Sequence, residues 1–143
     1  MLLERENINP DYIDPELFDQ TPLAVAAENG HEGVVKMLLE RKDVNPDHAD
    51  TFYGQTPLSL AAESGHEGVV KMLLEREDVN PDHADTDSSR TPLAFAAAKG
   101  HQGVVEMLLE SADVNPDQPD TFYGRTPLLW AAVNGNEGVV KIL

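Results

Sequence analysis

The side chains best suited to chemistry are the aspartates of a recurring Asp-Val-Asn-Pro-Asp segment, at 43–47, 78–82 and 113–117. Carboxylates at alternate positions can open a calcium loop, which also needs glycine at the sixth position and a bidentate glutamate at the twelfth. The sixth position instead holds His48, His83 or Gln118, and the twelfth holds Gly54, Ser89 or Gly124. We therefore expect turns in which Asn and Asp bond their own backbone, and no metal site.

No arrangement typical of catalysis or cofactor binding accompanies these aspartates. The chain has no cysteine and no glycine-rich phosphate loop, and no histidine is spaced to pair with a nucleophile. His31, His66 and His101 each follow a glycine and are interpreted as hydrogen-bonded structural residues, with Asn136 in the fourth equivalent place. The sequence therefore predicts neither an enzyme nor a zinc or cofactor site.

The charge balance favours one kind of partner. The chain has 26 acidic and 10 basic residues, a net charge of −16, which repels nucleic acids and anionic lipids. A protein or peptide with a basic surface is the expected partner. No stretch reaches the roughly 18 apolar residues of a membrane helix, and the N-terminus does not resemble a secretion signal, so a cytoplasmic or nuclear location is expected.

A repeated segment organises the chain. Thr-Pro-Leu begins at Thr21, Thr56, Thr91 and Thr126, so the period is 35 residues each time. A period in this range indicates a repeat array. We expect a single array over residues 1–143, with partial units at 1–20 and 126–143 and full periods at 21–55, 56–90 and 91–125.

Each period predicts two short helices and a connector. Thr21 as N-cap with Pro22 at the first helical position is a strong helix start, and Gly30 ends that helix. A second helix is expected from near Glu32 to about Arg41. Residues 43–55 are rich in Pro, Asp and Gly, which is typical of a turn or hairpin connector.

Both helices carry apolar stripes that a single unit is too small to bury. One face of the first helix gathers Leu23, Ala26, Ala27 and Gly30, and the second helix gathers Val34, Val35, Leu38 and Leu39. Alanines let a neighbouring helix approach closely. Each unit is therefore expected to stack on its neighbours.

These residues resemble the ankyrin repeat. The shared string is G-x-TPL-xx-AA-xx-GH-xx-VV-xx-LL followed by Asp-Val-Asn, and it covers essentially the whole chain. The resemblance implies an all-α repeat solenoid of stacked helix-turn-helix units with β-hairpin fingers. It also implies a concave face, made by the first helices and the fingers, that binds other proteins.

The chain departs from the family pattern in three places. The histidine usual after Thr-Pro-Leu is replaced by Ala24, Ser59, Ala94 or Leu129. The Gly-Ala that usually closes the second helix is missing, so that helix must end without a glycine cap. The finger is a few residues longer, and with its Asn-Pro-Asp this 35-residue variety resembles the repeats of large fungal nucleotide-binding receptors. Three asparagines, Asn45, Asn80 and Asn115, resemble those that a dioxygenase hydroxylates in some ankyrin repeats, although a proline follows each of them here.

Differences between the copies point to a binding face. They gather on the side of the first helix opposite its stacking stripe, and at the finger tip. In the family these are the usual contact positions. The partner-binding residues expected on this basis are Val25, Glu28, Asn29, Phe52, Tyr53, Leu60, Glu63, Ser64, Ser88, Arg90, Phe95, Ala98, Lys99, Phe122, Tyr123, Arg125, Trp130 and Val133.

Side-chain size at one of these positions increases along the stack, in the order Val25, Leu60, Phe95 and Trp130. Large aromatic residues on a solvent-facing side are typical of interface hot spots. Other interpretations stay open: the positions vary because nothing constrains them, Phe95 and Trp130 fill a groove between helix and finger, or the finger aromatics pack against each other.

The sequence therefore favours a protein–protein interaction module with its site on the concave face. The alternatives are a structural spacer or autoinhibitory segment of a larger receptor, and an engineered binder scaffold. The irregular first finger, at residues 9–15, favours a natural origin.

Overall fold

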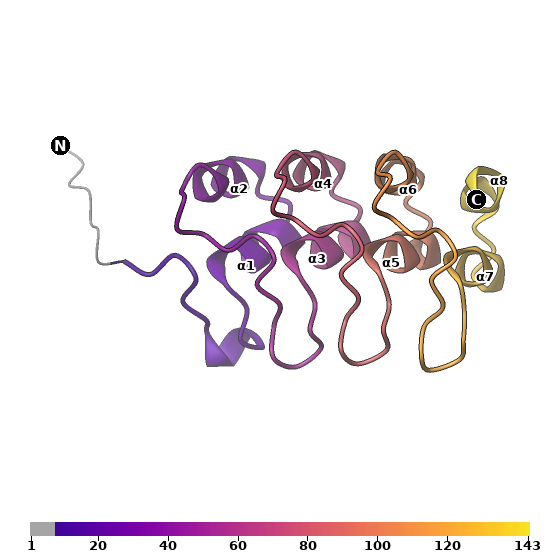
Figure 1. Cartoon of the computed structure of the whole chain (residues 1–143), viewed down its shortest axis with the longest axis horizontal. Helices are drawn as coiled ribbons and strands as arrows, with labels where there is room; N and C mark the ends of the chain where they lie inside the picture. The colour runs from indigo at the N-terminus through magenta and orange to yellow at the C-terminus, as the bar shows by residue number, and fades with distance from the viewer. Residues whose placement is uncertain (1–7) are drawn as a thin grey trace.

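The computed structural model describes residues 8–143 and, over that range, contains eight α-helices and one short 3-10 helix, η1 (Pro15–Leu17). The first helices of the four pairs are α1 (Pro22–Glu28), α3 (Pro57–Ser64), α5 (Pro92–Lys99) and α7 (Pro127–Val133). The second helices are α2 (Glu32–Leu39), α4 (Glu67–Leu74), α6 (Gln102–Leu109) and α8 (Glu137–Ile142). Figure 1 shows the pairs side by side, with second helices in the upper row, first helices in the middle row and finger-like loops below.

The first helices begin where the Thr-Pro pattern predicts. Thr21 Oγ1 accepts a hydrogen bond from the Ala24 amide at 3.2 Å. Thr56, Thr91 and Thr126 make the same contact at 3.2, 3.2 and 3.3 Å. Each side chain satisfies one of the free amides of the first turn, which fixes the helix start.

The turn within a helix pair is also a packing site for the next pair. Gly65 ends α3 with φ of 77°, and a Cβ there would lie only 2.6 Å from Nδ1 of His101. His101 Nε2 in turn lies 2.9 Å from the carbonyl oxygen of Glu63, and His66 makes the equivalent bond one unit earlier. The structural role predicted for His66 and His101 is confirmed, and Asn136 takes over this role in the fourth copy.

The end units show what stacking buries. Val69 of α4 is fully buried, whereas its equivalent Val34 in α2 is 48% exposed. At the other end Val140 of α8 is 39% exposed, while its equivalent Val70 is fully buried. One valine of each second helix therefore packs on the preceding pair and the other on the following pair. Burial of such a side chain contributes about 1.5–3 kcal/mol, so each unit depends on its neighbours.

The second helices end without a glycine cap, as expected. α2 stops at Leu39, slightly before the predicted Arg41, and the C-cap residue Glu40 keeps a right-handed conformation. One unit later, Arg76 Nη1 donates to the carbonyl oxygen of Leu39 at 2.7 Å. The same guanidinium binds Asp78 with two hydrogen bonds, at 2.9 and 2.7 Å. An arginine from the next unit therefore satisfies a free carbonyl at the end of α2.

The expectation of β-hairpin fingers is not met in residues 8–143, which contain no strand and one isolated bridge, between Asp14 and Gln20. In the second finger the Asp50 amide donates to the carbonyl oxygen of Gln55 at 3.0 Å. The buried carboxylate of Asp50 accepts hydrogen bonds from the amides of Phe52, Tyr53, Gly54 and Gln55, at 3.0, 2.6, 3.3 and 3.0 Å. The second finger is therefore a side-chain-stabilised turn.

The Asn-Pro-Asp segments form the predicted Asx turns. Asn45 Oδ1 accepts from the Asp47 amide at 3.1 Å, and the next two copies repeat this bond at 3.0 Å. Asp47 Oδ2 then accepts from the amide of Asn80 in the following unit at 2.7 Å, which links consecutive connectors. Burial raises the pKa of the Asp47 carboxyl, and the bond from Asn80 offsets only part of that effect.

Candidate partner-binding face

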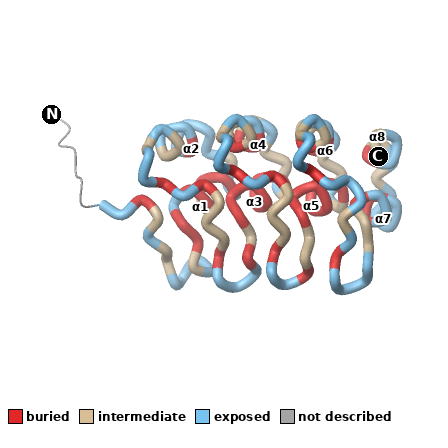
Figure 2. Tube along the Cα trace, in the orientation of Figure 1, coloured by how far each residue is buried: buried red, intermediate tan, exposed pale blue. Residues whose placement is uncertain are grey.

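We define the finger face as the surface made by the four first helices and the finger turns at 14–20, 50–55, 85–90 and 120–125. Figure 2 shows that the first helices are mostly buried and that the finger tips are exposed. Among the predicted contact residues, those exposed are Glu28, Asn29, Phe52, Tyr53, Ser64, Lys99, Phe122, Tyr123 and Val133. Those partly exposed are Val25, Glu63, Arg90, Ala98 and Arg125.

Four predicted contact residues are buried, which corrects the expectation that they face solvent: Leu60, Ser88, Phe95 and Trp130. The helical wheel placed Leu60, Phe95 and Trp130 opposite the stacking stripe, but the finger folds back over that side and covers it. Ser88 was expected at the exposed tip of the third finger. Phe95 and Trp130 are only 7% and 9% exposed, so they fill the groove between helix and finger. Ser88 donates its hydroxyl to Asp85 at the base of the third finger.

The finger tips carry exposed aromatic side chains. Phe52 meets Phe18 of the preceding finger edge-on, with ring centroids 5.7 Å apart, and Tyr53 lies 6.4 Å from the same ring. Phe122 and Tyr123 of the fourth finger pack on each other, yet are 59% and 66% exposed. The third finger has no aromatic residue in its turn at 85–90. Two aromatic tips therefore flank a polar one.

Two arginines cover the buried aromatic groove at the C-terminal end. The Arg90 guanidinium carbon lies 3.9 Å from the Trp130 ring centroid and 5.9 Å from that of Phe95. The Arg125 guanidinium carbon lies 4.8 Å from the Trp130 centroid and 4.4 Å from that of Tyr123. Such stacking uses the flat face of a guanidinium and is worth about 0.5–2 kcal/mol.

Asp120 anchors this cluster from below. Burial alone would raise the pKa of its carboxyl group, because the ionised form loses water. Hydrogen bonds from the Tyr123 amide at 2.8 Å and Trp130 Nε1 at 2.7 Å outweigh that effect, with Arg90 lying 3.9 Å away. The net result is a lowered pKa, so Asp120 is ionised at neutral pH.

The N-terminal half of the finger face uses a different pairing. Gln20 Nε2 donates to Glu28 at 3.2 Å, and Gln55 Nε2 donates to Glu63 at 3.1 Å. In both cases the acceptor stands eight residues after the donor, at the end of the first helix. Each glutamate therefore has a neutral partner and keeps its negative charge.

The C-terminal half has a stronger donor and no acceptor at the same positions. Arg90 and Arg125 replace the glutamines, while Ala98 and Val133 replace the glutamates. Among residues 8–143, Arg125 pairs with no carboxylate within salt-bridge distance, and the closest carboxylate to Arg90 is the buried Asp120 at 3.9 Å. Exposed Lys99 adds a further positive charge to this half. The N-terminal half of the finger face is therefore acidic, whereas in the C-terminal half the cations Arg90, Lys99 and Arg125 equal the carboxylates of Asp85, Asp87 and Asp120 in number.

Much of the negative charge lies away from the finger face. The exposed glutamates of the second helices and their caps are Glu32, Glu40, Glu67, Glu75, Glu106, Glu110 and Glu137. The side of the second helices is therefore acidic as well.

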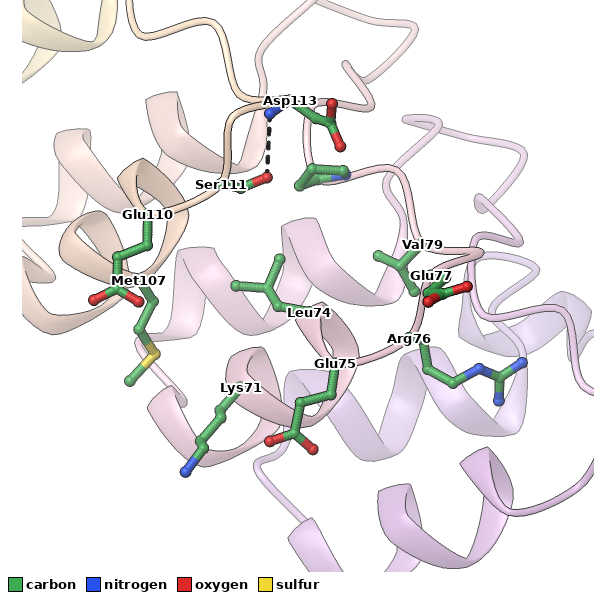
Figure 3. Close-up of a pocket in the computed structure, with 11 residues that line it drawn as sticks. Lys71, Leu74, Glu75, Arg76, Glu77, Val79, Met107, Glu110, Ser111 and Asp113 are labelled. Atoms are coloured by element: carbon green, nitrogen blue, oxygen red, sulfur yellow. Dashed lines mark hydrogen bonds between the residues drawn. The ribbon is translucent and has the colours of Figure 1, made fainter.

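Two clefts offer concave surface, one on each side of the array. A cleft of about 450 Å³ lies between α4 and α6; Figure 3 shows Leu74 in its middle, with Met107 and Glu110 on one side and Val79 on the other. A cleft of about 300 Å³ lies on the finger face, where Tyr53, Glu63, Arg90 and Phe122 contribute to its walls. Residues that differ between copies line both clefts, including Arg76 and Glu77 in the first and Arg90 and Phe95 in the second.

Stacked helix pairs with long finger turns define a helical repeat protein. A family model described as ankyrin repeats (3 copies) matches residues 1–85 and again residues 79–143. The chain therefore belongs to the ankyrin repeat family, whose members are generally non-catalytic protein–protein interaction modules. No curated protein matches the sequence of this chain. No helix within residues 8–143 is long and apolar enough to cross a bilayer.

Several residues that shape this face were missed by sequence reasoning. Asp50, Asp85 and Asp120 hold the bases of the fingers, and Gln20 and Gln55 pair with the glutamates of the first two units. Both positions recur with the 35-residue period, so a comparison of the copies position by position would have found them.

Proposed function

We propose that the chain binds a polypeptide partner on its finger face, with the exposed tip aromatics as its main apolar contacts. The supporting observation is that Phe52, Tyr53, Phe122 and Tyr123 are well exposed although water disfavours such side chains. Aromatic residues with a polar end are common hot spots of interfaces. Burial of Phe95 and Trp130 gives them a supporting role beneath the surface.

The experiment compares the two sides of the array. Tyr53→Ala and Phe122→Ala should each preserve folding, because both side chains are exposed, and at least one should cost about 2 kcal/mol or more of binding to a captured partner. Lys36→Ala and Lys71→Ala on the second helices are the controls and should leave binding unchanged. Dependence on the lysines alone would place the partner on the other side, and a structural spacer would show no binding at all.

The finer assignments are also proposals. The Asn-Pro-Asp fingers and the 35-residue period support a unit of the kind found in fungal nucleotide-binding receptors. An array of this charge supports a cytoplasmic or nuclear setting and a partner with basic groups, which approaches faster at low salt.

A further inference from the structure

The C-terminal half of the finger face has donors whose equivalent acceptors are absent. In the first two copies a glutamate accepts a hydrogen bond from the side-chain amide of the glutamine eight residues before it, at 3.2 and 3.1 Å. At the next two copies the equivalent donors are Arg90 and Arg125, and the acceptor sites hold Ala98 and Val133. Guanidinium groups are stronger donors than amides and bind carboxylates with two parallel hydrogen bonds.

We propose that this half of the finger face binds an acidic side chain of the partner polypeptide, whose carboxylate takes the place of the missing glutamates between Arg90 and Arg125. The inference rests on the proposed function, because it names the chemistry of the partner at that same face. Both guanidinium carbons lie within 5 Å of the centroid of one ring, that of Trp130, so the two arginines belong to one cluster.

Stacking on the aromatic rings leaves the edges of the guanidinium groups for this role. A guanidinium stacks with its flat face, while its N–H groups point outward in the plane. The Arg90 side chain is 24% exposed; its Nε is buried, 3.9 Å from Asp120 Oδ2, so the terminal nitrogens are the atoms left for a ligand. The one nearby carboxylate, on Asp120, is fully covered and already accepts from Trp130 and Tyr123.

The opposite half specifies the other end of the partner. The hydrogen-bond partners of Glu28 and Glu63 are neutral glutamines, so no cation offsets the charge of either glutamate. A segment that places a basic residue over α1 and α3 and an acidic residue over α5 and α7 therefore satisfies both halves. This polarity fixes the direction in which the segment lies along the array.

The partner is unidentified, so the probe is a random dodecapeptide library displayed on phage and selected against the full chain. Peptides are retained for analysis if Tyr53→Ala or Phe122→Ala weakens their binding, which shows that they use the finger face. Affinity is then measured from the fluorescence of Trp130, the only tryptophan of the chain and the residue beneath the two arginines.

Enriched peptides should share an Asp or Glu, and changing it to Asn or Gln should weaken binding by about tenfold or more. Ala98→Glu should have the same effect, because it restores the internal acceptor that Gln55 has in Glu63. Arg90→Gln should weaken binding in the same way. Both replacements introduce residues that other copies carry at those positions. Gln102→Glu is the matched control: it changes the charge by the same amount on α6 and should leave affinity unaltered.

Two results separate the inference from the proposed function. Finger-face peptides that share no acidic residue, or that bind Ala98→Glu as well as the native chain, overturn the inference and leave the proposed function standing. Enriched peptides whose binding ignores Tyr53→Ala and Phe122→Ala overturn the proposed function itself.

Discussion

The two halves of the finger face have the same backbone and different chemistry. In the N-terminal half an aliphatic residue, Val25 or Leu60, lies below a Gln–Glu pair. In the C-terminal half an aromatic residue lies below an arginine, and no glutamate is present. Because each arginine stacks on the ring below it, the larger core residue and the cationic cover belong together. From the N-terminal to the C-terminal half, the side chain in the groove and the charged residue above it therefore change together.

The largest expected difference between the halves is in stability. Phe95→Ala should lower the free energy of unfolding by about 3–5 kcal/mol, because it empties a buried groove and removes a stacking surface for Arg90. Val25→Ala, at the equivalent but partly exposed position, should cost only about 1 kcal/mol. Urea unfolding followed by circular dichroism measures both. Equal losses would show that the two grooves are packed alike.

Acid should act in opposite directions on two aspartates, Asp120 in the C-terminal half and the partly buried Asp47 in the connector that precedes the second finger. The lowered pKa of Asp120 gives stability that is present above the ordinary carboxyl range near 3.9 and is lost as pH falls through the native value. The raised pKa of Asp47 gives stability that is present below that range and is lost as pH rises through the native value.

Two variants test this assignment. At neutral pH Asp120→Asn should cost about 1.5–3 kcal/mol and flatten the acid side of the stability profile. Asp47→Asn should cost much less at the same pH, since it removes a desolvated charge while keeping an acceptor for Asn80. Unfolding free energies measured between pH 3 and pH 7 distinguish them. A greater loss for Asp47→Asn at neutral pH would contradict the assignment.

A smaller effect tests the missing acceptor directly. Ala98→Glu should stabilise the chain by about 0.2–1 kcal/mol through a new pair with Arg90 on the surface. A double-mutant cycle with Arg90→Gln isolates that pair from the change in charge. The cycle should show a favourable coupling that shrinks as salt increases. Zero coupling would mean that stacking on Trp130 holds Arg90 out of reach of position 98.

The sequence predicted the helices well because their signals are local. Thr21 with Pro22, and Gly30 after the first helix, act within one turn of the chain and lie where expected. The burial of Phe95 depends instead on a finger that folds back from outside the helix, which a helical wheel does not contain. The β-hairpin fingers are not found in residues 8–143, and in the second finger the carboxylate of Asp50 binds the turn amides, a contact that the sequence pattern alone does not predict.

The effect expected to be smallest is that of calcium, and it bears on a feature that both halves share. The Asn-Pro-Asp connectors are the same in the N-terminal and C-terminal units, and their Asn side chains already bind the backbone amides of the aspartates that follow. One oxygen of Asp47 and one of Asp82 also bind the next connector, and the other oxygen of each is buried. Millimolar calcium should therefore leave the melting temperature within error, apart from the general screening that magnesium also provides. A saturable rise of several degrees with calcium alone would mean that these connectors open to bind the ion, and that their Asx turns are one of two states.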